Sequence, residues 1–165
     1  MELKFQVQTK IQKPVKEVFD AVYNPDKLSG YFTNGGASAP LNEGTTVEWA
    51  FADNPDEKPI TGPVTVQKII PNELIVLGWE GAKGHNTRIE MNFEKTGPEE
   101  TLVKISESGW RETQGDLESS YGNCMGWSQM LSALKAFVEY GINLRKGAYG
   151  GLYKAEDFKS VKKAQ

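Results

Sequence analysis

Hydrophobic and polar positions alternate with period two in the first segment of the chain. One face of residues 2–13 carries apolar or β-branched side chains, namely Leu3, Phe5, Val7, Thr9 and Ile11. Alternation over such a length predicts a half-buried strand. From Pro14 onward the apolar positions recur with helical spacing, which predicts a short helix with this proline in its first turn. Asn24-Pro25-Asp26 then predicts the start of a second short helix.

The middle of the chain predicts strands joined by turns, with no helical segment between them. Residues 35–44 are small and turn-forming, which predicts a loop. Alternating or strongly apolar segments follow, separated by short polar or Gly/Pro turns, at residues 45–52, 62–70, 73–79, 87–95 and 101–110. Consecutive strands with short connections favour an antiparallel meander over a parallel α/β sheet.

The longest predicted element is a helix between Asp116 and Tyr140. Its apolar stripe consists of Leu117, Tyr121, Cys124, Trp127, Leu131, Leu134 and Val138, widened by Met130 and Phe137. Asp116 suits the first turn, and Gly141 suits the C-terminal stop. So long a helix can bury its stripe only against the concave face of a curved sheet. The sequence therefore predicts an α+β helix-grip fold, in which a curved six-stranded antiparallel sheet wraps around this helix and two short helices follow the first strand.

Length and charge add limits to this picture. The 165 residues fit one domain, which we expect to span residues 1–141, followed by a basic tail at 142–165 that can form a short helix. Hydrophobic residues at 38% and charged residues at 25% exclude a disordered chain. The net charge of −3 argues against a nucleic-acid partner. Residues 145–165 nevertheless carry six basic and two acidic side chains; this tail can contact RNA or a partner, but we expect it to lie against its own acidic domain.

Several kinds of site are excluded or disfavoured. A single cysteine, Cys124, and a single histidine, His85, allow no intrachain disulfide and argue against a metal site. A thiol–imidazole pair is also disfavoured, because His85 lies in a polar turn and Cys124 on the predicted buried helix face. Phosphate-loop, dinucleotide, calcium-loop and G-x-S-x-G motifs do not occur. We therefore expect no metal and no other cofactor. We also expect a cytoplasmic protein, because there is neither a signal core nor an apolar run of ~18 residues.

Four motifs in a fixed order along residues 2–141 carry a family resemblance. Residues 11–19 read I-x-x-P-x-x-x-V-F, and residues 62–79 contain G-P-V, I-I-P and a Leu-to-Trp strand. A strand from Thr101 to Trp110 and a helix from Gly126 to Gly141 complete the set. The chain thus resembles the START/Bet v 1-like (SRPBCC) superfamily, and within it single-domain relatives of the activator of Hsp90 ATPase homologue C-terminal domain. Residues 34–36 and the tail after Gly141 depart from that pattern.

The resemblance implies more than one function. Some members bind a hydrophobic small molecule in an apolar cavity between helix and sheet; others act on polyketide-like ligands or serve as co-chaperones, and the fold does not choose among them. Our leading hypothesis is binding of a hydrophobic small molecule. The alternatives are an Hsp90-type co-chaperone or interaction module, and a cyclase- or hydrolase-like enzyme using Glu107. A binding protein without catalytic residues is favoured over an enzyme, and the oligomeric state stays open.

Glu107 is the sharpest candidate residue. On its predicted strand it shares a face with Val103 and Ile105, so its carboxylate is expected to point into the interior and to anchor a ligand or exchange a proton. Two other outcomes stay open: a bulge near Gly109 can turn it to solvent, or it can pair with Arg111. The other candidate ligand-binding residues are the Tyr121 hydroxyl near the strand-to-helix junction and the side chains of Trp49, Trp79, Met91 and Trp127. Large apolar side chains also serve as plain core packing.

Overall fold

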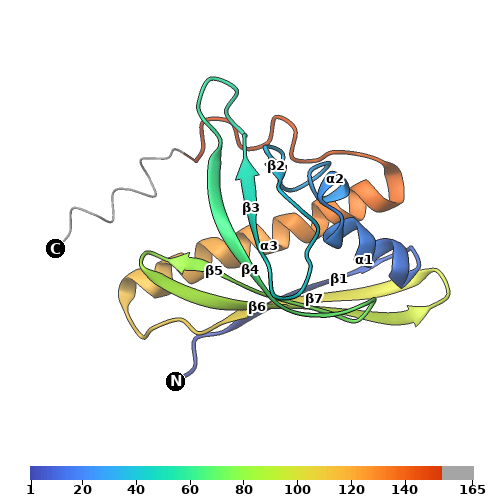
Figure 1. Cartoon of the computed structure of the whole chain (residues 1–165), viewed down its shortest axis with the longest axis horizontal. Coiled ribbons are helices and arrows are strands. Elements are labelled where there is room, and N and C mark those ends of the chain that lie inside the picture. Colours follow the sequence, from blue (N-terminus) through green and yellow to red (C-terminus); the bar gives the residue numbers. More distant parts are fainter. Residues whose placement is uncertain (154–165) are drawn as a thin grey trace.

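One antiparallel sheet curls around a long helix in the computed structural model, which describes residues 1–153 (Figure 1). The elements are β1 (Phe5–Ile11), α1 (Val15–Tyr23), α2 (Pro25–Leu28), β2 (Gly36–Ala37), β3 (Thr46–Phe51), β4 (Ile60–Ile70), β5 (Leu74–Ala82), β6 (His85–Gly97), β7 (Glu100–Ser108) and α3 (Gln114–Tyr140). The strand order is β1-β7-β6-β5-β4-β3-β2, and every neighbouring pair is antiparallel. The predicted helix-grip fold is therefore confirmed.

The sheet has seven strands rather than the predicted six. The additional strand, β2, lies within the segment predicted as a loop and pairs with Ala50 and Trp49 of β3. Its two residues are Gly36 and Ala37, so no alternation of side chains can reveal it. The pairing depends on close backbone approach: a Cβ on Gly35 would lie 3.0 Å from the Ala50 backbone.

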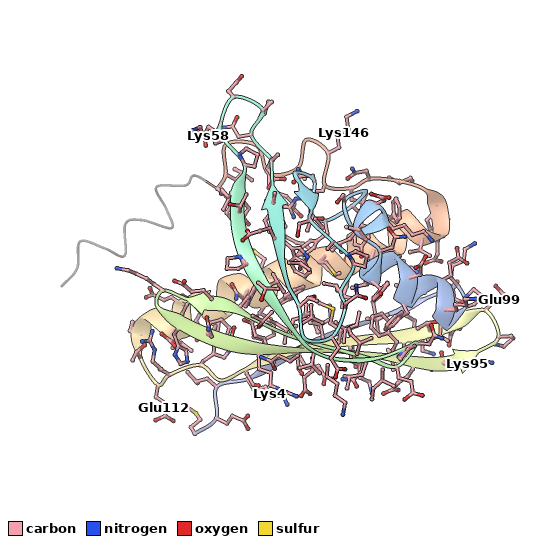
Figure 2. The ribbon with its side chains drawn as sticks, in the orientation of Figure 1. Lys4, Lys58, Lys95, Glu99, Glu112 and Lys146 are labelled. Carbon is pink, nitrogen blue, oxygen red and sulfur yellow. The ribbon has the colours of Figure 1, made fainter. Side chains whose placement is uncertain are left out.

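Buried apolar side chains from α1, α2, α3 and the concave face of the sheet form one continuous cluster. Charged side chains lie around the outer edge of the molecule, among them Lys4, Lys58, Lys95, Glu99, Glu112 and Lys146 (Figure 2). Within residues 1–153, none of the helices combines the length and the apolar character of a membrane span.

Helix α3 ends where the sequence predicts. Gly141 adopts a left-handed φ of 68°, its N–H donates to the Phe137 carbonyl at 2.9 Å, and the Ile142 N–H donates to the Ala136 carbonyl at 3.2 Å. This pairing satisfies carbonyls that the helix leaves free, and glycine adopts the required φ without a Cβ clash. Residues 142–153 then return toward the sheet and form turns rather than the short helix expected in the tail, and the rest of the tail, 154–165, lies outside the described residues.

The buried face of α3 agrees with the prediction only in its C-terminal half. Trp127, Leu131 and Leu134 are buried as expected, whereas Tyr121 is 64% exposed. Asp116 and Ser120 are buried in its place. They precede Trp127 by eleven and seven residues, which is helical spacing, so they share its face. The predicted stripe is wrong here because it follows apolar residues, whereas the buried residues at this end are polar ones with hydrogen-bond partners.

Asp116 fixes the start of α3. Its carboxylate accepts hydrogen bonds from the Arg111 guanidinium at 2.7 Å and from the Arg111 backbone N–H at 2.8 Å. The Thr113 hydroxyl caps the helix by accepting from the Asp116 N–H at 3.2 Å. The hydrogen bonds from Arg111 lower the pKa of Asp116 below its ordinary value, against the opposing effect of burial. Arg111 is thus paired with Asp116 and not with Glu107.

Asp116→Asn should destabilise the protein by about 2 kcal/mol at pH 7, because it removes a charged acceptor of several hydrogen bonds. Since the folded-state pKa of Asp116 is lowered, its stabilisation is present above the unfolded pKa of ~3.9 and is lost as the pH falls through the folded value. Urea unfolding of both proteins between pH 3 and 7 measures this difference. Glu118→Gln, two residues later on the exposed side of α3, is the control. An Asp116→Asn effect that stays constant down to pH 3 would contradict the ionic mechanism.

Candidate functional site

Glu107 points into the interior, as predicted. It lies on β7 opposite Ile89 of β6 and Phe5 of β1, and its side chain is completely buried. Gly109 has a positive φ of 90°, but it follows the last residue of the strand and does not turn Glu107 outward. Both alternative placements, in solvent and beside Arg111, are therefore wrong.

Four side chains donate hydrogen bonds to the Glu107 carboxylate. Oε1 accepts from Trp79 Nε1 at 2.9 Å and from the Thr87 hydroxyl at 2.5 Å. Oε2 accepts from Trp127 Nε1 at 2.9 Å, and Asn123 Nδ2 lies 3.1 Å from Oε1 and 3.3 Å from Oε2. All four donors are neutral, and the indole groups can only donate. This arrangement suits an acceptor-only carboxylate, and the described residues form no ion pair with it.

The donor side chains lie close together because cross-strand pairing and helical spacing place them on the faces of β5, β6 and α3 that are turned toward Glu107. Thr87 pairs with Trp79 across β5 and β6 and shares its face of β6 with Ile89, which lies opposite Glu107. Asn123 and Trp127 are four residues apart on α3 and so lie on one face of the helix. The sequence analysis missed Thr87 and Asn123, although the parity of the strand and the helical spacing place both beside residues that it selected.

A glycine at a bulge makes room for this network. The pairing of β5 with β6 shifts register between Glu80 and Ala82, which leaves Gly81 as the extra residue. A Cβ on Gly81 would lie 2.1 Å from the Thr87 hydroxyl oxygen and 2.7 Å from Oε1 of Glu107. Only glycine fits at this point, and no pattern in the sequence identifies it.

Two of the predicted aromatic residues, Trp79 and Trp127, contact the carboxylate, and Trp49 packs against Trp79. The Trp79 and Trp127 rings lie 5.2 Å apart, and the Trp49 and Trp79 rings 6.3 Å apart in an edge-to-face arrangement. Phe32 joins the group, with ring centroids 5.6 Å from Trp49 and 5.7 Å from Trp127. We call Phe32, Trp49, Trp79 and Trp127 the aromatic cluster. Trp49 is 1% exposed, and its indole N–H has no hydrogen-bond acceptor among the described residues.

The remaining candidates lie farther from the carboxylate or outside the interior. Met91 is completely buried on the same face of β6, opposite Ile105 and one inward-facing position beyond Ile89. Tyr121 projects from the outer side of α3, so the prediction that it belongs to the buried stripe of this helix is wrong. The His85 ring nitrogen Nε2 lies 2.6 Å from the Gly109 carbonyl oxygen. In the part of the chain that the structure describes, no three His, Cys, Asp or Glu side chains are grouped to hold a metal ion.

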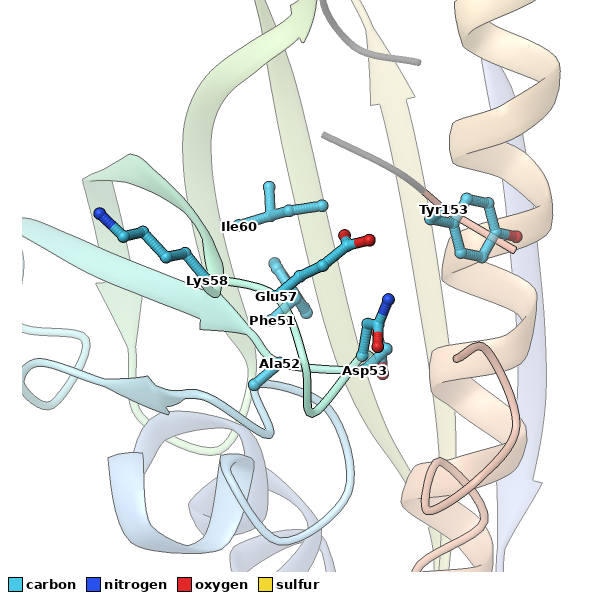
Figure 3. Close-up of a pocket in the computed structure, with 8 residues that line it drawn as sticks. Phe51, Ala52, Asp53, Glu57, Lys58, Ile60 and Tyr153 are labelled. Carbon is cyan, nitrogen blue, oxygen red and sulfur yellow. The ribbon is translucent and has the colours of Figure 1, made fainter. Parts of the chain in front are cut away.

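Two hollows lie at other places on the molecule. A groove of about 630 Å³ runs along α1 and the β4–β5 turn, between Phe19, Tyr23 and Pro71. A cavity of about 20 Å³, room for about one water molecule, lies at the β3–β4 hairpin between Phe51, Asp53 and Tyr153 (Figure 3). Neither is lined by Glu107 or by a tryptophan. Glu107, Trp49 and Trp127 are at most 2% exposed, so neighbouring side chains fill the space around the carboxylate.

Comparison with known proteins identifies a family and several solved structures to which this chain is similar. A family model described as "Activator of Hsp90 ATPase homolog 1-like protein" matches residues 12–139. A comparison with curated proteins gave no significant match. Solved structures match closely in fold. A protein from Staphylococcus saprophyticus is 22% identical with a TM-score of 0.71, and the match covers 87% of this chain and 97% of that one.

Two further structures show the same fold. The Aha1 dimer from Colwellia psychrerythraea is 22% identical over 84% of this chain and 98% of that chain, with a TM-score of 0.69. DynU16, from the dynemicin biosynthetic locus, is 21% identical over 87% of this chain and 50% of that chain, with a TM-score of 0.73. At these identities the likeness establishes the fold and leaves the activity open.

Gly81→Ala should destabilise the protein by about 1–3 kcal/mol, because the added methyl group overpacks the Glu107–Thr87 contact. Gly62→Ala is the matched control: Gly62 also lies within a strand, but its Cβ would meet no atom within 4 Å. Urea unfolding followed by tryptophan fluorescence measures both. Equal stability of the two variants would show that the glycine does not make room for the network.

Proposed function

The chain belongs to the activator of Hsp90 ATPase homolog 1-like family, and from this premise we propose that it binds a flat, largely apolar small molecule between the sheet and α3, with Glu107 as the polar anchor. The observation that carries the proposal is the carboxylate itself, completely buried and held by four neutral donors. We assign no catalytic step to Glu107, because both of its oxygens already accept hydrogen bonds from side chains.

A buried carboxylate without a neighbouring cation stabilises a folded core less than an apolar side chain does. Desolvation of an ion costs several kcal/mol, and an apolar side chain of similar volume often gives equal or better stability. Local departures from good packing are expected at functional sites. Here the departure involves four elements at once, since β5, β6, β7 and α3 each contribute a side chain. The convergence of side chains from four elements on one carboxylate supports a binding role over plain packing.

The surroundings of Glu107 indicate the chemistry of the ligand. The rings of Trp49, Trp79 and Trp127 offer flat apolar surfaces on which an aromatic or conjugated molecule can stack. In this proposal a ligand hydroxyl takes the place of the Asn123 amide, whose contacts with the carboxylate at 3.1 and 3.3 Å are the longest. The unpaired indole N–H of Trp49 can donate to a carbonyl. Met91 completes the apolar wall in this proposal. We therefore propose a planar ligand that carries both a hydroxyl and a carbonyl group.

The location proposed for this activity is the cytoplasm. Cys124 is the only cysteine of the chain, and it is unpaired, as is usual in a reducing compartment. The similarity of fold to DynU16, which comes from a biosynthetic locus, is compatible with a small-molecule ligand.

7-Hydroxyflavone and flavone test the role of Glu107, because they share a planar frame and a carbonyl and differ in one hydroxyl group. We expect saturable quenching of tryptophan fluorescence by both. Glu107→Gln should weaken binding of 7-hydroxyflavone by about tenfold, the worth of a hydrogen bond to a charged group, and should change flavone binding little. Glu94→Gln, which removes a surface carboxylate paired with Lys104, is the control. The anchor role is wrong if neither compound binds, or if the Gln variant loses affinity for both equally while urea unfolding shows it folded.

A second candidate function is contact with an Hsp90-type chaperone. The description of the family and the likeness to the Colwellia Aha1 protein favour it. The outer side of α3 also exposes two large apolar side chains, Tyr121 at 64% and Met125 at 48%. Such side chains on a folded surface suit a protein contact.

For this candidate we expect that saturating protein stimulates the ATPase of an Hsp90-type chaperone, and that changing Tyr121 and Met125 together to Ser reduces the stimulation at least several-fold, because apolar anchors dominate interfaces. Tyr140→Ser, an exposed tyrosine at the other end of α3, is the control. A steady-state ATPase assay measures the effect. Absence of stimulation by the unmodified protein removes this candidate.

A further inference from the structure

We infer that residues 141–153, which we call the strap, form a closure over the aromatic end of the helix–sheet interior and that Arg145 is its latch. Release of the latch would give a ligand access to the aromatic cluster. The access part rests on the proposed function, whereas the closure itself does not. The strap lies beyond residues 12–139, so it is an addition to the part of the chain that the family model describes.

The latch is a two-pronged ion pair that is largely withdrawn from water. Arg145 Nε lies 2.8 Å from Asp53 Oδ1, and one terminal nitrogen lies 2.6 Å from Oδ2. The two side chains are only 15% and 12% exposed. Asn34 supports the carboxylate by donating to Oδ1 at 3.0 Å. An exposed ion pair contributes little, but a bidentate pair with low exposure has both better geometry and less screening.

Aromatic rings surround the same guanidinium. Its central carbon lies 5.0 Å from the ring centroid of Phe51, 5.8 Å from that of Phe32 and 4.9 Å from that of Tyr149. These distances are within the range of cation–π attraction, which is stronger where the cation is poorly hydrated. Two of the rings belong to the domain and the third belongs to the strap, so Arg145 joins the two.

Side-chain contacts connect the latch to Glu107. Arg145 covers Phe32, the Phe32 ring lies 5.7 Å from that of Trp127, and Trp127 Nε1 donates to Glu107 at 2.9 Å. Figure 1 shows the orange-to-red segment after α3 running back past α2 and β2 toward the β3–β4 hairpin. The strap therefore lies over the end of the aromatic cluster that Phe32 forms.

Little else holds the strap to the sheet. Among the described residues, every side-chain hydrogen bond between the strap and the sheet or its loops comes from Arg145. The backbone bonds beyond Ile142 are local ones, such as Ala148 N–H to the Arg145 carbonyl at 3.0 Å. Leu144 and Leu152 are 50% and 67% exposed. Segments with few buried contacts open at low free energy, so among the described polar contacts the Arg145–Asp53 pair is the one that opposes opening of the strap.

The small cavity at the β3–β4 hairpin marks the edge of this closure. Phe51 and Asp53, which hold the latch, line it together with Tyr153 at the end of the strap (Figure 3). Nearby, a Cβ on Gly150 would lie 3.1 Å from the Asp53 carbonyl oxygen, so the strap also approaches the hairpin backbone closely. The seam between strap and hairpin is thus tight at Gly150 and hollow beside Tyr153.

Three variants of the full chain test the latch. Asp53→Asn keeps the shape of the carboxylate and removes its charge, Arg145→Lys keeps the charge and removes the fork, and Arg145→Ala removes both. Lys146→Ala, which changes the neighbouring exposed cation, is the control. We expect hydrogen exchange of peptide 141–153 to rise on the order of tenfold in the three latch variants, with β6 and β7 unchanged, because only local opening is favoured. Acrylamide quenching of tryptophan fluorescence should also increase. Wild-type exchange and quenching in Asp53→Asn and Arg145→Ala would overturn the closure.

Stopped-flow association of 7-hydroxyflavone tests access. The association rate should rise on the order of tenfold in Asp53→Asn and Arg145→Ala, in proportion to the open population, and should be unchanged in Lys146→Ala. If exchange and quenching rise while the association rate does not, the strap opens but is not the route of entry, and the access part is wrong. If the flavone binds none of the proteins, the proposed function fails, and exchange and quenching still decide whether the strap is latched.

Discussion

A carboxylate removed from water needs donors for both of its oxygens, and several features of this protein follow from that need. Glu107 receives them from two indoles, a hydroxyl and an amide. Supplying them requires Thr87 at an inward position of β6 and a polar residue on the buried side of α3. It also requires a glycine where β5 passes closest. One buried charge thus explains a bulge, a polar strand position and part of a helix face.

The same constraint divides α3 into two halves with different roles. Its C-terminal half packs against the sheet through Trp127, Leu131 and Leu134, as an amphipathic helix does. Its N-terminal half is anchored by polar contacts instead, through Asp116 at the start and Asn123 at the carboxylate. Because polar groups take the most buried positions there, Tyr121 and Met125 face outward, while Leu117 and Cys124 are half-buried. The proposed ligand site and the proposed chaperone contact therefore occupy opposite sides of the same helical segment.

The fold of the family determines where the interior between helix and sheet lies, and the side chains of this chain determine how that interior is filled. The rings of the aromatic cluster contact one another in the region of the proposed site, so in our proposal a ligand displaces rings rather than entering an existing space. The guanidinium of Arg145 lies over Phe32 of this cluster, so the segment beyond the family match is in direct contact with the proposed site.

The sequence by itself determined several placements that follow from a local pattern. The strand alternation places Glu107 inward with Val103 and Ile105, the helical spacing predicts Trp127 on the buried face, and Gly141 ends α3. The structure alone shows which residues meet: Asn123 with Glu107 across sixteen positions, and Arg145 with Asp53 across ninety-two. It also decides that Tyr121 faces outward and that residue 81 must be glycine. A pattern of hydrophobicity records how each residue relates to its chain neighbours, whereas a buried polar group is satisfied by partners that only the packing of distant elements brings within hydrogen-bonding distance.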